Sequence, residues 1–218
     1  MSYKVQAQNI DKYKNPSYLS PTRWTSYAIQ IREVMRLRPK RVLEIGPGNN
    51  LVTGILRSLD IEVETLDIDS RIGVDHVGSV TDVETLENLK GKFDVVLAFQ
   101  IFEHIEYDDF KKAVVCLRAV VPQIIMSLPH TITNAKFFRF CLEMPFVGKI
   151  DWTFKLVYRP IKYLFNGEHY WEMGTKGYPI RRIEGDLQEA GWRIKKSFFN
   201  PDNPYHYFFV LESNESQH

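Results

Sequence analysis

Residues 41–50 constrain the fold more than any other part of the chain. They read as a short apolar strand at 42–45, then a turn containing Gly46, with a helix beginning near Asn50. A strand, a glycine turn and a helix in this order let backbone N–H groups and a helix N-terminus approach a ligand closely. The run therefore predicts a ligand site within an α/β fold.

A second acidic cluster indicates that the ligand carries a nucleoside. Asp67 and Asp69 follow the next apolar strand, at 61–66, and Asp67 comes 21 residues after Gly46. In dinucleotide-binding folds an acid about 20 residues beyond the glycines bonds a ribose hydroxyl. The spacing therefore predicts that Asp67 contacts a ribose.

The glycine pattern narrows the choice of nucleoside. A dinucleotide fingerprint, G-x-G-x-x-G, has a third glycine that allows close helix–strand packing. Here Gly46 and Gly48 are followed by Leu51 at that position. Glu44 would also repel a pyrophosphate, whereas it suits a ligand with a positive amino group. The pattern counts against a nicotinamide-dependent oxidoreductase, which is the competing enzyme interpretation.

Apolar strands and helices alternate along the chain, and the 218 residues suffice for one α/β domain. Such alternation predicts a doubly wound, Rossmann-like and mostly parallel sheet with helices on both faces. Strands are expected at 42–45, 61–66, 75–80, 93–99, 123–128, 193–199 and 205–211, and helices at 20–38, 50–59, 83–89, 108–121 and 180–190.

These motifs resemble those of the class I S-adenosylmethionine-dependent methyltransferases. The resemblance spans residues 42–211 in the family's order and rests on five segments. They are the (D/E)-x-G-x-G motif at 44–48, the acid Asp67, the fourth strand with its E-H-I turn at 93–105, the fifth strand at 123–130, and the helix end at 189–192. The family implies seven strands, the seventh antiparallel and inserted between the fifth and the sixth.

The resemblance also implies S-adenosylmethionine as the cofactor. The residues expected to bind it are Glu44, Gly46, Gly48, Asp67, Ile68, Ser79, Val80 and Gln100. Glu44 is expected to face the aminoacyl part and Asp67 the ribose. Ser79 stands where the family often has an acid near adenine, so the adenine contact falls to the backbone, to Ser79 or to a displaced Asp82.

An aromatic insertion interrupts the plain pattern after the fifth strand. Eleven aromatic residues lie within the 35 positions 137–171, and basic residues outnumber acidic ones there. The insertion could pack on the sheet or form a lid over the acceptor pocket, where open α/β sheets bind ligands. A peripheral membrane contact through 137–171 is a further alternative. The domain divides into an N-terminal arm and helix (1–40), a cofactor core (41–130), the insertion (131–178) and the last helix with two strands (179–218).

Composition bounds the other classes of function. A net charge of +1 gives no signal for nucleic acid. Cys116 and Cys141 are the two cysteines, too few for a disulfide framework or a thiolate zinc site. The chain lacks the apolar run of a signal peptide or a membrane span, so a cytoplasmic enzyme is expected.

Methyl transfer needs alignment of donor and acceptor, and a general base where the acceptor starts as a hydroxyl. His169, flanked by acids and aromatics, is the first candidate for the catalytic residue, and His130 after the fifth strand is the second. His104 is expected to serve the turn. Although His104 and His169 could pair at a metal, no spacing such as H-x-x-x-H occurs, so no metal is expected.

The sequence thus predicts methyl transfer from S-adenosylmethionine to oxygen or nitrogen of a small-molecule, lipid-linked or sugar-linked acceptor. The alternative from another class is a non-catalytic sensor or partner subunit that binds S-adenosylmethionine. The oligomeric state stays open.

Overall fold

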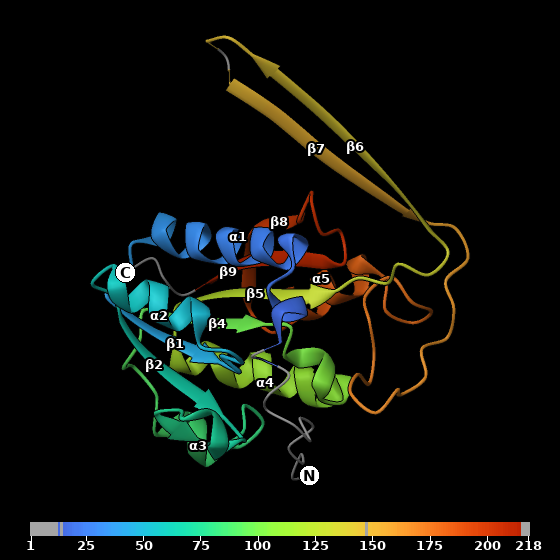
Figure 1. Cartoon of the computed structure of the whole chain (residues 1–218). Coiled ribbons are helices and arrows are strands. Elements are labelled where there is room, and N and C mark those ends of the chain that lie inside the picture. Colours follow the sequence, from blue (N-terminus) through green and yellow to red (C-terminus); the bar gives the residue numbers. More distant parts are fainter. Residues whose placement is uncertain (1–12, 14, 147, 215–218) are drawn as a thin grey trace.

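A computed structural model describes residues 13, 15–146 and 148–214 (Figure 1). The strands of the main sheet are β1 (Arg41–Ile45), β2 (Glu62–Asp67), β3 (His76–Val77), β4 (Val95–Phe99), β5 (Gln123–Pro129), β8 (Trp192–Phe199) and β9 (His206–Ser213). The α-helices are α1 (Pro21–Leu37), α2 (Leu51–Ser58), α3 (Val83–Glu87), α4 (Tyr107–Val120) and α5 (Ile180–Glu189). Short 3-10 turns are η2 (Pro16–Leu19), η3 (Ser70–Ile72) and η4 (Phe102–His104).

The main sheet has the order β3-β2-β1-β4-β5-β9-β8. The first five strands in this order pair in parallel, whereas β9 pairs antiparallel with both β5 and β8. The predicted fold is confirmed, including the last strand inserted between the fifth and the sixth. Because Ile45 is in register with Leu66 and Ala98, the carboxyl ends of β1, β2 and β4 meet at one edge.

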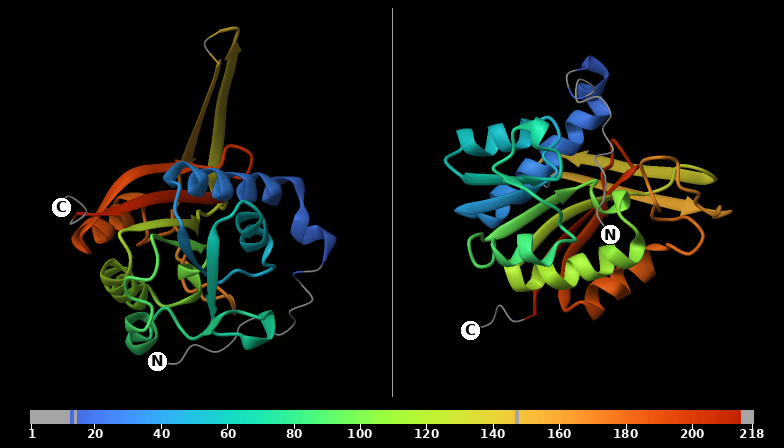
Figure 2. Two further views of the ribbon diagram at one scale, coloured as in Figure 1. Left: turned by 90° about the vertical axis from the view of Figure 1, so that its left-hand side faces the viewer. Right: turned by 90° about the horizontal axis from the view of Figure 1, so that it is seen from below.

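Both faces of the central strands are buried, as parallel sheets require. In β1, Leu43 and Ile45 pack into the layer under α3, α4 and α5, whereas Val42 packs into the layer under α1 and α2. The helices therefore cover both faces (Figure 2). Among the helices of the described ranges, none has the length and hydropathy needed to cross a bilayer.

The first helix begins where the sequence predicts. The Ser20 hydroxyl accepts a hydrogen bond from the Arg23 amide at 3.4 Å, and Pro21 occupies the first helical position. Of the N-terminal arm expected before this helix, residues 1–12 and 14 lie outside the described residues.

The insertion contains two strands that the sequence did not predict. β6 (Ala135–Met144) and β7 (Gly148–Val157) form a separate antiparallel hairpin that projects away from the body (Figures 1 and 2). We call residues 135–157 the arm. At its base Lys155 donates hydrogen bonds to the carbonyls of His130 and Pro204 at 2.9 and 3.0 Å.

Candidate active site

A cavity of about 640 Å³ opens at the carboxyl ends of the parallel strands. Its walls come from the start of α1, the turn after β1, the end of β2, the turn after β4, and two loops late in the chain. This is the position at which open α/β sheets bind ligands. The eight residues expected to hold the cofactor all line it, namely Glu44, Gly46, Gly48, Asp67, Ile68, Ser79, Val80 and Gln100.

The turn after β1 has a backbone that requires glycine. Gly46 and Gly48 have φ angles of +64° and +59°, in the left-handed region. A Cβ on Gly46 would also overlap Cδ1 of Ile101. The turn therefore brings the backbone close to the cavity, as the motif predicts.

Glu44 is a buried carboxylate at this end of the cavity, with 4% of its surface exposed. It accepts a hydrogen bond from the hydroxyl of Thr53 in α2. Burial raises the pKa of Glu44 to about 7, against the effect of that hydrogen bond. A positive group entering the cavity would therefore meet a carboxylate that is poorly solvated.

Two neighbouring acids at the end of β2 differ in what they already bond. Asp69 holds the guanidinium of Arg71 through both oxygens, at 2.8 and 2.7 Å. Asp67 accepts a backbone hydrogen bond from the Asp69 amide at 2.8 Å, makes no ion pair comparable with that of Asp69 among the described residues, and has its pKa raised by burial. Asp67 is thus the better placed of the two to accept hydrogen bonds from a ligand.

The alternatives for the adenine contact also separate. Ser79 lines the cavity, with its hydroxyl 2.8 Å from that of Thr81. Asp82 instead caps α3, accepting from the amide and hydroxyl of Thr85 at 3.1 and 2.6 Å. Ser79 and the backbone near Val80 therefore remain as the candidates for the adenine contact.

Gln100 follows β4 in a left-handed conformation, with φ at +57°. Its side-chain amide donates to the Ser127 hydroxyl at 3.1 Å, which holds the residue at the cavity wall. Such a backbone in a non-glycine residue costs energy and occurs preferentially at functional sites.

A further part of the cavity wall, which we call the second end, is formed by η4 and residues 168–173, which we call the docked segment. Hydrogen bonds join the docked segment to η4 and to Ile105, which follows it. The ring of His104 lies 3.0 Å from the carbonyl of Glu168, the Tyr170 amide donates to the carbonyl of Glu103 at 2.8 Å, and the Trp171 indole donates to the carbonyl of Ile105 at 3.1 Å. Glu103, His104, Glu168 and His169 consequently line the cavity.

His169 is the centre of a polar network at this end. Its Nδ1 lies 3.1 Å from Oε1 of Glu172, which also accepts from the hydroxyls of Tyr205 and Tyr163 at 2.7 and 3.3 Å. Burial would lower the pKa of His169, but the bond to Glu172 and the nearby Glu103 outweigh it, so the pKa is raised. The ring is therefore oriented by a carboxylate, which favours a proton on Nδ1.

Glu103 was not singled out from the sequence as a site residue. Its side chain is fully buried, and neither carboxylate oxygen has a hydrogen-bond partner among the described residues. Burial raises the pKa of Glu103 to about 8. A buried acid without a partner at a cavity wall is costly in the empty protein, which points to a group that it would bind.

The alternative catalytic candidate, His130, is wrong in its placement. The structure buries its ring against Gly174, Phe199 and Tyr207, and the residue does not line the cavity. Burial lowers its pKa to about 4, so it is a neutral core histidine. Its position after β5 is as predicted, but its side chain turns into the sheet layer.

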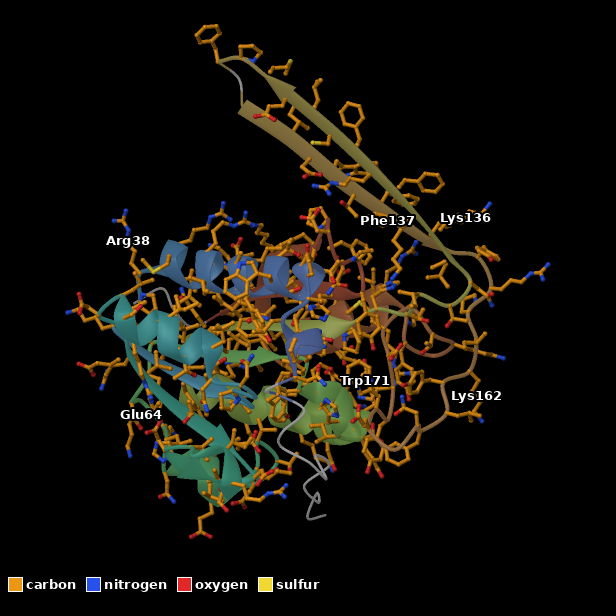
Figure 3. All side chains as sticks on the ribbon, viewed as in Figure 1. Arg38, Glu64, Lys136, Phe137, Lys162 and Trp171 are labelled. Carbon is orange, nitrogen blue, oxygen red and sulfur yellow. The ribbon has the colours of Figure 1, made fainter. Side chains whose placement is uncertain are left out.

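The two parts of the insertion differ in their relation to the cavity. Of the described insertion, Glu168 and His169 line the cavity. The arm projects from the body (Figure 1), and none of its described residues is among those that line the cavity. Trp171 lies inside the body, while Phe137 stands at the base of the arm (Figure 3).

The N-terminal region supplies walls that the sequence did not predict. Tyr13, Tyr18, Arg23 and Tyr27 all line the cavity, and the Arg23 guanidinium lies 4.0 Å from the ring centre of Tyr18. Helical spacing alone shows which residues can share a face, but not that α1 begins beside the strand ends.

Comparisons with known proteins agree with this geometry. The sequence model of a family described as a methyltransferase domain matches residues 22–130, half of the chain. A comparison with curated proteins finds no match.

Solved structures share the fold at low identity. The 1,6-didemethyltoxoflavin-N1-methyltransferase of Burkholderia thailandensis, solved with S-adenosylhomocysteine, is 14% identical with a TM-score of 0.57, covering 95% of this chain and 86% of that one. An S-adenosylmethionine-dependent methyltransferase of Clostridium acetobutylicum is 10% identical with a TM-score of 0.55, over 87% and 90%. A glycopeptide N-methyltransferase with S-adenosylhomocysteine is 12% identical with a TM-score of 0.54, over 84% and 88%. The family match, the strand order and the motif-bearing edge of the sheet together place this chain in the class I S-adenosylmethionine-dependent methyltransferases.

Proposed function

We propose that this methyltransferase transfers the methyl group of S-adenosylmethionine to an oxygen or nitrogen of a small molecule, free or linked to a lipid or sugar. The observation that carries the proposal is one continuous cavity. It joins the end formed by Glu44 and Asp67 to the end formed by Glu103, His104 and His169. A cofactor and an acceptor can thus meet within it.

The residues at the first end fit S-adenosylmethionine. Glu44 offers a buried carboxylate for the ammonium group, Asp67 offers acceptors for two ribose hydroxyls, and the turn at Gly46 lets the backbone approach. Ser79 and Val80 would border the adenine. When bound, S-adenosylmethionine supplies an activated methyl group, and alignment of the acceptor is the main task left to the protein.

At the second end, His169 would receive the proton of the acceptor. With Nδ1 held by Glu172, Nε2 is the ring nitrogen that can accept a proton. Glu172 and its two tyrosine partners fix the orientation of the ring. This role is useful for a hydroxyl acceptor, which must lose its proton during methylation.

The volume of about 640 Å³ is that of a small-molecule site and has to hold both reactants. Two of the named neighbours are an N-methyltransferase of 1,6-didemethyltoxoflavin and a glycopeptide N-methyltransferase. The cavity volume therefore suits a small acceptor, or a larger acceptor that inserts only one end into the cavity.

We also propose that the arm contacts a membrane surface peripherally, which would suit a lipid-linked acceptor. One face of the arm is apolar and exposed, formed by Phe138, Phe140, Leu142, Ile150, Trp152 and Phe154. Exposed apolar surface of this kind is typical of interaction sites.

The activity can be tested with methyl-labelled S-adenosylmethionine and fractionated cell extract. We expect label in a small-molecule fraction with the wild-type protein, and none above background with His169→Ala. Label in protein or nucleic acid alone, or no transfer despite cofactor binding, would contradict the proposal.

A further inference from the structure

Three side chains that come from two distant segments converge at the second end of the cavity. Glu103 and His104 belong to η4, and His169 belongs to the docked segment. One potential ligand atom from each lies within 4.8 Å of the other two, and the two rings meet edge to face at 4.8 Å between centres. The sequence analysis considered His104 and His169 as a metal-binding pair and did not expect a metal, because their spacing gave no support. The fold brings the two together across 65 residues and adds Glu103 to them.

In both imidazoles Nδ1 lies against an oxygen atom, which leaves Nε2 as the nitrogen that can bind an ion. His104 has Nδ1 3.0 Å from the carbonyl of Glu168, and His169 has Nδ1 3.1 Å from the carboxylate of Glu172. An oxygen acceptor at Nδ1 favours the proton there, so that Nε2 carries the lone pair. This carboxylate–histidine or carbonyl–histidine arrangement is typical behind metal-binding histidines.

Glu103 supplies the independent observation. It is fully buried, and neither of its oxygens has a hydrogen-bond partner among the described residues. The cluster thus brings a carboxylate oxygen within 4.8 Å of one nitrogen of each imidazole, and a carboxylate so buried needs a cation or a donor.

We propose that Glu103, His104 and His169 bind a divalent transition-metal ion such as Zn²⁺. Two histidines and one carboxylate are a ligand set of catalytic zinc sites, which keep a further position open for water or substrate. Ligands at about 2.1 Å from one ion lie at most about 4.2 Å apart. The three ligand atoms lie up to 4.8 Å apart in the structure, so ion binding would draw the three side chains closer together.

The open position faces the cavity in which the acceptor would bind, so the ion would hold an acceptor hydroxyl. This part of the inference rests on the proposed function. A metal lowers the pKa of a bound hydroxyl. With an ion bound, the ring of His169 would be a ligand, and this role would replace the proton-acceptor role proposed above for the site without an ion. The hydroxyl proton would then pass to solvent, and the oxygen would bond to the methyl carbon while the carbon–sulfur electron pair returns to sulfur. An oxygen acceptor is therefore favoured over nitrogen.

The site can be tested on the full chain, without an affinity tag and after treatment with a chelator. Zn²⁺ is titrated calorimetrically, and Co²⁺ is added to record visible absorption from a tetrahedral or five-coordinate site. We expect one equivalent of either ion to bind and Zn²⁺ to raise the melting temperature.

Substitutions distinguish the three residues proposed to bind the ion from Glu172, which orients the ring of His169. Glu103→Gln, His104→Asn and His169→Asn should each weaken Zn²⁺ binding by about a hundredfold or more, and Glu172→Gln by about ten- to a hundredfold. His76→Ala, which removes a histidine paired with Glu64 outside the cavity, should bind like the wild type. A variant that fails to fold leaves two other ligand variants to decide.

Stoichiometric binding that disappears in the ligand variants supports the site. Absence of binding to the wild type, or equal binding in all variants, overturns it. S-Adenosylmethionine is titrated separately into the chelator-treated protein. Metal uptake without cofactor binding would refute the proposed function alone, and cofactor binding without metal uptake would refute this inference alone.

Discussion

The arm and the docked segment come from the same aromatic-rich insertion but differ in solvent exposure. In the arm, Phe140 and Trp152 are 56% and 61% exposed, although they pair directly across the two strands. In the docked segment, Trp171 and Met173 are fully buried. Figure 3 shows the contrast between the projecting side chains of the arm and Trp171 inside the body. An excess of aromatic residues therefore does not say where a segment lies.

The difference follows from where each backbone finds hydrogen-bond partners. The arm satisfies its backbone locally, because β6 and β7 pair along ten residues each. The docked segment instead bonds to η4 and to the end of β5, where Met173 and His130 form a bridge. Docking of this kind places His169 at the cavity and gives the segment its functional position.

The largest difference between the two segments is expected in turnover, when His169 of the docked segment or Trp152 of the arm is replaced. His169→Ala should lower turnover by about 10²- to 10⁴-fold, the usual effect of losing a positioned proton acceptor, with cofactor affinity within threefold. Trp152→Ala in the arm should keep turnover within about twofold on a soluble acceptor, since Trp152 is exposed and does not line the cavity. Steady-state kinetics on both variants decides the matter, and equal losses would show that the arm belongs to the site.

Stability gives the next largest contrast. Trp171→Ala removes a buried indole that packs on Tyr107 and Phe110 and donates to Ile105, so it should cost about 3–5 kcal/mol of unfolding free energy. Trp152→Ala should cost less than about 0.5 kcal/mol. Denaturant unfolding measures both. A loss at Trp152 comparable with that at Trp171 would mean that the arm packs on something in solution.

The pH dependence of cofactor binding tests the first end of the cavity. The pKa of Glu44 is about 7, and pairing with an ammonium group needs its carboxylate. Affinity for S-adenosylmethionine should therefore rise about tenfold from pH 6 to pH 8. Glu44→Gln should flatten the rise, and any slope that remains would report Asp67, whose pKa is also raised.

The unliganded protein should show the opposite trend. Because the pKa of Glu44 is higher folded than its ordinary value of 4.5, the folded state binds more protons between pH 4.5 and 7. This contribution to stability is present at low pH and is lost as the pH rises through about 7. Unfolding free energies of the wild type that stay level relative to Glu44→Gln over this range would contradict the assignment.

The smallest effect is expected from shortening the arm. Replacing residues 139–153 by Asn-Gly closes the hairpin between Phe138 and Phe154, which are directly paired, and keeps Lys155 at its base. The variant loses the exposed ion pair of Arg139 with Asp202, so unfolding free energy should change by less than about 1 kcal/mol. Sedimentation with anionic vesicles should be reduced, and unchanged vesicle binding would refute the membrane contact.

Much of the fold could be predicted because its signals are local. The glycine turn at Gly46, the acid Asp67 and the alternation of strands are each read from neighbouring residues. The structure places Gly46 and Asp67 at the same edge of the sheet. The second end could be predicted only in part. His169 was found from its neighbours, but the burial of Glu103 and the convergence of Glu103 and His104 with His169 depend on how residues 168–173 dock, which no spacing encodes.

The failures have the same physical origin. His130 follows β5 as predicted, yet whether its side chain points to the cavity or the core depends on Gly174 and Phe199, which pack against its ring. The arm carries the composition of a lid, but β6 and β7 find their partners in each other. Composition predicts burial only on average, whereas these placements depend on single contacts.

The most direct test of the account is calorimetric titration of S-adenosylmethionine into three proteins: the wild type, Asp67→Ala and the variant with the shortened arm. We predict one binding site in the wild type and an affinity about ten- to a hundredfold weaker in folded Asp67→Ala. The affinity of the variant with the shortened arm should equal that of the wild type. No binding of S-adenosylmethionine to the wild type, preferential binding of NAD, or unchanged affinity in Asp67→Ala would contradict it.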